Sequence, residues 1–281
     1  ALGAGIYRHE AGGLAAAETS PLVVSHALCG DFDGDGAADV LAALAPEDGL
    51  PALRLLRGDG AGGLEAAAGG TRLGGTVLGL AFADVDADGD ADVLVGRAES
   101  APRLLLGDGH GAFTDAPAGS LPAGGVGALP ALADLDGDGA PDALLVGPEG
   151  AALWLGEGGR FADHSGLGVA IPARRPVEIH VADLDVDGAL DVLVLGGGAP
   201  LLLRNDGGGR LFDYSDVLLT RPGPEPARGA LVDVEGDGDP DLVLLHPGAR
   251  GPRLLLGWDP APFVDPDADG IPNVDDNCPG V

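Results

Sequence analysis

The sequence predicts an all-β protein, and more narrowly a β-propeller of four-stranded blades. Three observations support this prediction. An acidic pattern of nine residues occurs five times in the 281-residue chain, and successive copies start 49 to 53 residues apart. Short runs of Val, Leu and Ala flank each copy, and glycine-rich turns separate these runs. No segment sustains the 3.6-residue apolar period of an amphipathic helix, so helices are not expected.

Each repeat supplies four strands. A first strand precedes the acidic loop and a second follows it; a third strand, a glycine turn and a fourth strand come next, as in 103–113. Radial repetition of such units is how a β-propeller protects its sheet edges, whereas a linear solenoid would need shorter repeats. The expected first strands are 77–83, 128–133, 179–182 and 229–232, and the expected second strands are 40–44, 93–96, 143–147, 192–196 and 242–245.

The repeats divide the chain into a propeller at 1–264 and a tail at 265–281. The propeller consists of an N-terminal hairpin at 1–20 and five repeats at about 21–70, 71–120, 121–170, 171–220 and 221–264. The hairpin resembles the last two strands of a unit without its loop. It completes a blade of this ring, or belongs to a larger propeller, or accepts a strand from a neighbouring copy in a head-to-tail polymer.

Composition agrees with a compact chain rich in turns. Gly (51) and Pro (23) are abundant, but the hydrophobic fraction of 45% is too high for a solvated acidic coil. The net charge of −30 repels phosphate, so we expect neither nucleic acid nor an anionic membrane as a partner. No apolar run approaches the roughly 20 residues of a membrane span.

The five loops have the chemistry of calcium sites. Carboxylates stand at positions 1, 3, 5 and 9, and glycine at position 6 permits a sharp turn. Ca²⁺ takes six to eight oxygen ligands, and position 7 adds a backbone carbonyl. The predicted ligands are Asp31, Asp33, Asp35, Ala37 and Asp39; Asp84, Asp86, Asp88, Asp90 and Asp92; Asp134, Asp136, Asp138, Ala140 and Asp142; Asp183, Asp185, Asp187, Ala189 and Asp191; and Asp233, Glu235, Asp237, Asp239 and Asp241.

Two other interpretations of the loops are weaker. An EF-hand needs a Glu at position 12 and flanking helices, whereas position 12 here is always apolar and strand-like. Simple Asp-Gly hairpin turns would explain one loop. They do not explain five loops with the same set of acids, because unneutralised carboxylates repel one another.

These features resemble a known family. The Asp-x-Asp-x-Asp-Gly-x-x-Asp loop, the apolar strand after it and the Gly-x-Gly-x-Phe hairpin look like the FG-GAP/VCBS repeat of integrin alpha-chain propellers and many secreted bacterial proteins. The resemblance covers roughly 1–264 and implies a calcium-binding propeller. It implies no single activity, because the family includes adhesins, ligand-binding ectodomains and accessory domains of polysaccharide-degrading enzymes. Glu235, at position 3 of the fifth loop, departs from the pattern.

The tail carries a different acidic motif. It resembles the start of a thrombospondin type 3 repeat, an extracellular calcium-binding spacer, and this resemblance implies a sixth calcium site. The matching positions are Asp265, Asp267, Asp269, Asn273 and Asp276.

Two cysteines are too few for a disulfide scaffold. In the thrombospondin family, a cysteine placed like Cys278 in the tail usually pairs with one in a neighbouring repeat, which this chain lacks. Cys29 is therefore either a buried apolar thiol or the partner of Cys278 in a disulfide that ties the tail to the first repeat.

No catalytic site is expected, because the six histidines occupy unrelated positions and no G-x-S-x-G motif occurs. Trp154 is expected to pack within a strand, and Trp258 is a candidate exposed contact. We expect a secreted or cell-surface protein for adhesion, scaffolding or surface assembly, whose partner is an extracellular protein, a glycan or another copy. The alternatives are a carbohydrate-recognition or enzyme-accessory propeller, and a subunit of a strand-exchanged polymer.

Overall fold

The computed structural model describes residues 5–10, 13–19, 24–44, 51–164, 175–215, 228–234, 240–245 and 253–255. Every element bounded within these ranges is a β-strand, and all strand pairs are antiparallel. The all-β prediction is confirmed. Within the same ranges, no helix has the length and apolar character needed to cross a membrane.

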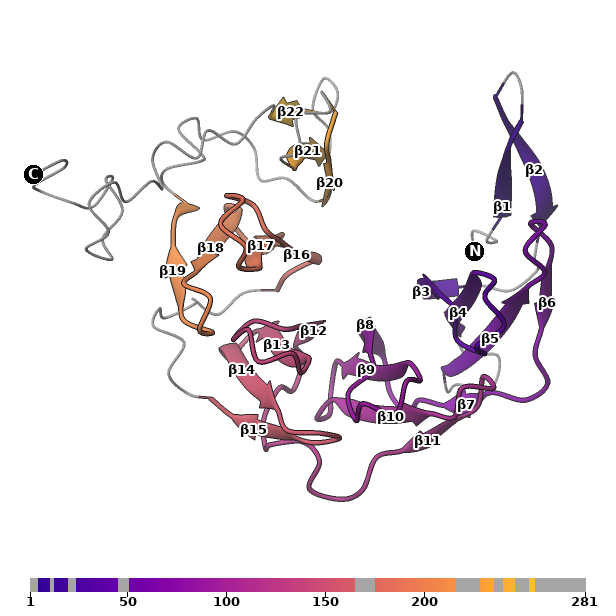
Figure 1. Ribbon diagram of the computed structural model, residues 1–281, viewed down its shortest axis with the longest axis horizontal. Helices are drawn as coiled ribbons and strands as arrows, with labels where there is room; N and C mark the ends of the chain where they lie inside the picture. Colours follow the sequence, from indigo (N-terminus) through magenta and orange to yellow (C-terminus); the bar gives the residue numbers. More distant parts are fainter. Residues whose placement is uncertain are drawn as a thin grey trace, which may run out of the picture. The chain divides into compact units, whose positions relative to one another are not determined.

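The chain divides into two compact units, Ala1–Ala133 with Gly139–Ser165, and Asp134–Asp138 with Gly166–Val281. The first unit contains one hairpin and three larger sheets (Figure 1). The hairpin is β1 (Gly5–Glu10) and β2 (Gly13–Thr19). The sheets are β3 (Val24–Gly30), β4 (Asp39–Leu44), β5 (Ala52–Gly58) and β6 (Leu64–Ala66), with β7 (Thr71–Arg72) also on β5; β8 (Val77–Ala83), β9 (Asp92–Arg97), β10 (Arg103–Gly107) and β11 (Phe113–Asp115); and β12 (Leu129–Ala133), β13 (Asp142–Gly147), β14 (Gly150–Gly156) and β15 (Phe161–Asp163).

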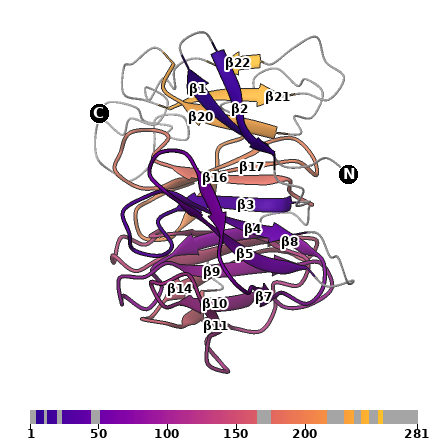
Figure 2. The same ribbon diagram turned by 90° about the vertical axis from the view of Figure 1, so that its right-hand side faces the viewer.

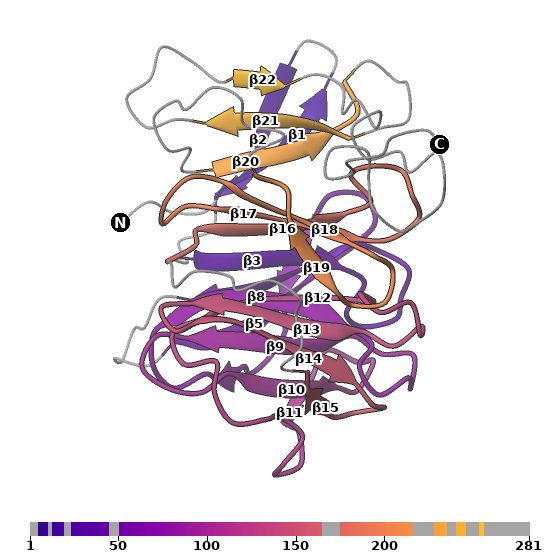
Figure 3. The ribbon, with the colours of Figure 1, turned by 90° about the vertical axis from the view of Figure 1, so that its left-hand side faces the viewer.

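Consecutive sheets of the first unit pack face to face. Their first strands are neighbours, since β8 lies beside β3 (Figure 2) and beside β12 (Figure 3). Strand β9 is buried on both faces. Val93 and Val95 join the core cluster that contains Leu41 of β4, whereas Leu94 points to the opposite cluster around Trp154 of β14. Trp154 is therefore a packing residue, as the sequence predicts.

The second unit contains two sheets. The first is β16 (Glu178–Ala182), β17 (Asp191–Leu195), β18 (Leu201–Asn205) and β19 (Leu211–Asp213), and the second is β20 (Arg228–Val232), β21 (Asp241–Leu245) and β22 (Arg253–Leu255). Leu193 and Leu195 of β17 share a core cluster with Leu242 and Leu244 of β21. The four-stranded sheet is thus confirmed in the second, third and fourth repeats; the first repeat's sheet has β7 in addition, and the fifth has three strands within the described residues. The closure of a propeller ring stays a prediction.

The acidic loops join the first and second strands of each sheet, where the sequence predicts them. Position 9 of the loop is the first residue of the second strand and pairs with the last residue of the first strand. This pairing is Gly30 with Asp39, Ala83 with Asp92, Ala133 with Asp142, Ala182 with Asp191 and Val232 with Asp241. The repeated register places position 9 in the same way on all five sheets.

Candidate metal centres in the repeated loops

Four loops bring three carboxylates together. In each, one carboxylate oxygen from positions 1, 3 and 9 lies within 4.8 Å of the other two. The groups are Asp31, Asp33 and Asp39; Asp84, Asp86 and Asp92; Asp134, Asp136 and Asp142; and Asp183, Asp185 and Asp191. Of the fifth loop, 235–239 lie outside the described residues, as do all the predicted ligands of the tail. Those sites stay predictions.

The position 9 carboxylate is buried and ties three parts of its repeat together. In Asp92, which has 0% exposure, Oδ2 accepts the N–H of Val85 in the loop (2.8 Å) and Oδ1 accepts the N–H of Gly107 at the end of β10 (2.9 Å). The same pair of bonds recurs in the first and fourth repeats. There Asp39 accepts from Phe32 (3.0 Å) and Gly58 (2.8 Å), and Asp191 accepts from Leu184 (3.0 Å) and Asn205 (2.8 Å).

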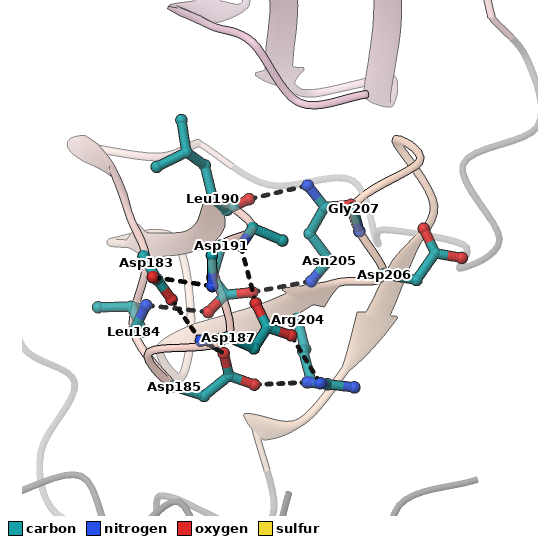
Figure 4. A network of polar contacts seen from close by, with 12 residues as sticks. Asp183, Leu184, Asp185, Asp187, Leu190, Asp191, Arg204, Asn205, Asp206 and Gly207 are labelled. Atoms are coloured by element: carbon teal, nitrogen blue, oxygen red, sulfur yellow. Dashed lines mark hydrogen bonds and ion pairs between the residues drawn. The ribbon is translucent and has the colours of Figure 1, made fainter. Parts of the chain in front are cut away.

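The residue that donates to Oδ1 from the end of the third strand is glycine for a steric reason. A Cβ on Gly58, Gly107 or Gly156 would lie inside contact distance of the backbone oxygen just before position 9. The fourth repeat has Asn205 instead. Its Nδ2 donates to Leu190 O (3.0 Å) and Leu135 O (2.7 Å), so this buried side chain is itself fully engaged (Figure 4).

Position 1 shapes the turn of the loop. The two oxygens of Asp31 accept the N–H groups of positions 4 and 6, Gly34 (2.8 Å) and Gly36 (2.9 Å). Asp84 and Asp183 also accept from the glycine at position 6, but their second donor is the N–H of position 5. Glycine at position 6 has a φ of 85° to 95° in all four described loops, which is the left-handed turn that the sequence predicts. At position 4, Val186 has a φ of 59°, an unfavourable value for a β-branched residue.

Position 5 is not part of the three-carboxylate groups. Its Oδ1 accepts the N–H of position 7 instead, at 2.7 Å from Asp35 to Ala37 and 2.9 Å from Asp88 to Asp90. This is a local Asx turn. The coordinating roles of positions 5 and 7 therefore stay predictions.

The second loop contains a buried oxygen without a protein partner. Among the described residues, Asp86 Oδ1 is inaccessible to solvent and makes no hydrogen bond. Burial raises the pKa of Asp86, and the neighbouring Asp88 carboxylate raises it further. Burial also raises the pKa of Asp92 to about 6, against the two backbone N–H bonds that lower it. A cation among these oxygens would supply the missing compensation, so the donor set fits a hard divalent ion.

The fourth loop differs because an arginine enters it. Arg204 of β18 places Nε 2.5 Å from Asp185 Oδ2 and Nη2 2.7 Å from Asp187 Oδ2 (Figure 4). Burial raises the pKa of Asp191 to about 7, and the Asp185 and Asp187 carboxylates raise it further against two backbone N–H bonds. In the first loop, Arg57 Nε lies 3.0 Å from Asp33 Oδ2.

Sequence reasoning missed these arginines, although a signal was present. Arg57 and Arg204 each immediately precede the residue that donates to position 9, where the second and third repeats have Leu106 and Leu155. Aligning the ends of the third strands would have exposed the difference.

Cys29 is exposed, so the prediction of a buried thiol is wrong. Half-buried and exposed residues alternate along β3, and Cys29 is one of the exposed residues. The disulfide with Cys278 stays a prediction, because Cys278 lies outside the described residues. Trp258 lies outside them too.

Fold and loops together define a class of protein built from repeated four-stranded sheets, each with an acidic loop between its first two strands. The chain matches the FG-GAP-like repeat family in four overlapping stretches, 31–95, 84–145, 134–194 and 183–244, and it belongs to this family. Every match starts at position 1 of a loop and ends in the second strand of the next repeat. No protein of curated function matches the sequence.

Several solved structures are similar in part. They include the biofilm matrix protein Bap1 of V. cholerae (20% identity, TM-score 0.45, 79% of this chain and 35% of that chain). A lectin of Agrocybe aegerita described as recognising non-reducing terminal N-acetylglucosamine (19%, 0.45, 79% and 75%) and the rhamnogalacturonan lyase PL11 of Bacillus licheniformis (13%, 0.40, 80% and 56%) also match. The chain spans 35% of the length of Bap1.

Proposed function

We propose that this protein is an extracellular calcium-binding β-propeller that serves adhesion, scaffolding or surface assembly. One observation carries the proposal: a group of three carboxylates recurs in four loops, and in the second loop it includes the buried, unpartnered Asp86 Oδ1. All the donors are oxygens, which suits Ca²⁺ better than a transition metal. Mg²⁺ demands stricter octahedral geometry and keeps more of its water, so it fits these loops less well.

Calcium has a structural role in this proposal. The ion would be held by positions 1, 3 and 9, and it supplies positive charge where burial leaves carboxylates uncompensated. The chain contributes the rest. Asp92 joins the loop to β10 through Val85 and Gly107, and Asp84 fixes the turn. Neutralising one loop therefore stabilises three strands of its sheet.

We propose no catalytic role and a location outside the cell or on its surface. The acids that would serve general acid–base chemistry are largely committed to the loops. Sites of extracellular calcium modules bind with dissociation constants of about 10⁻⁴ to 10⁻³ M, which calcium outside cells can fill. The carbohydrate-binding alternative needs an aromatic platform, and the one tryptophan in the described ranges, Trp154, is buried.

Thermal unfolding in 5 mM CaCl₂, 5 mM MgCl₂ and 5 mM EDTA tests the proposal. We expect calcium to raise the melting temperature well above the EDTA value, because a ligand that binds only the folded state stabilises it. Magnesium should raise it less. The double variant Asp84→Asn/Asp86→Asn removes one loop and should reduce the calcium gain, whereas Asp108→Asn, in the β10–β11 turn, is the matched control. A wild-type melt that is the same in calcium and EDTA would sink the calcium proposal.

A further inference from the structure

We propose that Arg204 is a built-in cation of the fourth loop and sets that loop's affinity for divalent ions below that of the second loop. The inference rests on the proposed calcium function of the loops. Arg204 would then determine the calcium affinity of the fourth repeat without changing that of the other repeats.

The guanidinium lies against a predicted metal ligand, where a bound cation would otherwise supply the positive charge. Asp185 belongs to the three-carboxylate group of the fourth loop, and its Oδ2 is already bonded to Arg204 Nε at 2.5 Å. Nη2 of the same guanidinium reaches Asp187 Oδ2 at 2.7 Å. Both are charge-assisted hydrogen bonds, which are about twice as strong as neutral ones. A dication must therefore displace these bonds or share the Asp185 carboxylate with a guanidinium that repels it.

Burial strengthens this competition. The Asp185 side chain is 2% exposed and that of Arg204 is 19% exposed, so water screens the ion pair poorly. Strand β18 holds the arginine in place, because the next residue, Asn205, donates its N–H to Asp191 and its side chain to Leu190 O. The arginine is thus held on a strand that is itself hydrogen-bonded to position 9 of the loop.

The second loop offers the contrast within the same chain. It has five acids, and the corresponding strand residue is Leu106, which packs partly into the core cluster of Val85 and Trp154. The fourth loop has four acids and one arginine, so its formal charge is −3 against −5 for the second loop. In the second loop Asp86 Oδ1 lacks a partner, whereas its counterpart Asp185 has one.

The first loop is intermediate. Arg57 Nε reaches Asp33 at 3.0 Å, but the arginine side chain is 47% exposed. Its Nη2 is also occupied by the backbone oxygen of His110 at 2.7 Å. Arg57 makes one solvent-exposed contact to its loop, so it competes with a bound cation less than Arg204, which makes two poorly exposed contacts. The expected order of calcium affinity is therefore second loop, first loop, fourth loop.

Arg204→Leu tests the inference by giving the fourth loop the residue of the second. Calcium binding to EDTA-stripped, buffer-exchanged full chain is measured by isothermal titration calorimetry, with melting temperatures in EDTA and in calcium. We expect one class of sites to tighten by about tenfold or more, because a positive charge next to the ion is removed. We also expect a lower melting temperature in EDTA, since Asp185 loses its partner. Adding Asp185→Asn should abolish the tightening.

Arg210→Leu is the matched control, because it removes a positive charge from the exposed β18–β19 turn, where Arg210 stacks on Phe212, without touching the loop. A calcium gain for Arg204→Leu no larger than for Arg210→Leu would overturn the inference. Leu106→Arg tests it in reverse and should weaken one wild-type site; unchanged binding by that variant would also count against it. Calcium titration of the wild-type chain distinguishes the Arg204 inference from the proposed function, because a wild-type chain that binds no calcium would refute the proposed function itself.

Discussion

Asp92→Asn isolates the role of the buried position 9 carboxylate from any role in metal binding. Asp92 accepts two backbone N–H groups, from Val85 at 2.8 Å and Gly107 at 2.9 Å. Asparagine has nearly the same size, but its amide can accept only one of them and turns an NH₂ donor toward the other. One buried N–H of either the loop or β10 is then left unsatisfied.

The expected loss follows from these contacts. Leaving a buried donor without an acceptor costs about 1 to 3 kcal/mol, and the bond that is lost is one to a charged group. Part of this is recovered because the buried charge is gone, and burial is what raises the pKa of Asp92 to about 6. We expect a net loss of about 2 kcal/mol in the free energy of unfolding, or a melting temperature lower by about 4 to 8 °C.

The assay is urea unfolding at pH 8 in EDTA, followed by circular dichroism. Asp88→Asn is the control, because it removes an exposed charge from the same loop and keeps the acceptor for Asp90 N–H. It should change the free energy by less than about 0.5 kcal/mol. Equal losses for the two variants would refute the reasoning, since they would show that the carboxylate does not tie the loop to β10.

Two further predictions concern stability. In EDTA, the free energy of unfolding should fall as the pH rises from about 4 to 8, because Asp92 and Asp191 have folded-state pKa values of about 6 and about 7, above the ordinary value of 3.8. Across that window the folded state holds protons that the unfolded state has lost, so raising the pH favours unfolding; saturating calcium should reduce the trend, and a metal-free stability that rises with pH would contradict it. Val186→Gly should stabilise the protein by about 1 kcal/mol in EDTA, since it relieves a φ of 59° at an exposed β-branched residue. Ala87→Gly, at the same position of the second loop, should gain less, and a destabilised Val186→Gly would show that the backbone there is not strained.

The local pattern of this chain was predictable from its sequence because its causes are local. Strand β9 is an apolar run between Asp92 and Arg97, and a continuous apolar run of this kind indicates a strand that is buried on both faces. Glycine at position 6 marks the left-handed turn directly. Positions 1, 3 and 9 are all among the predicted ligands, but the alternation of acids also predicts position 5, which the structure leaves out of the three-carboxylate groups.

What could not be predicted involves contacts between separate strands. Arg204 lies 19 residues after Asp185, and nothing in the composition tells whether its side chain turns to solvent or into the loop. The two amides that bind Asp92 come from residues on either side of it in sequence, seven before and 15 after. Cys29 was equally undetermined, because a first strand alternates between covered and open faces and one residue of register decides the outcome.

The bonds made by position 9 also bear on how such a chain can lengthen. Both partners of Asp39, of Asp92 and of Asp191 lie within the same repeat as the aspartate. A repeat copied by gene duplication therefore arrives with both position 9 hydrogen bonds already supplied by its own residues. Among the residues that donate to position 9 in these three repeats, Asn205 alone also uses its side chain to reach the previous loop, at Leu135 O. That repeat is tied to its predecessor, and a rearrangement that separated the two would leave a buried amide without one of its two acceptors.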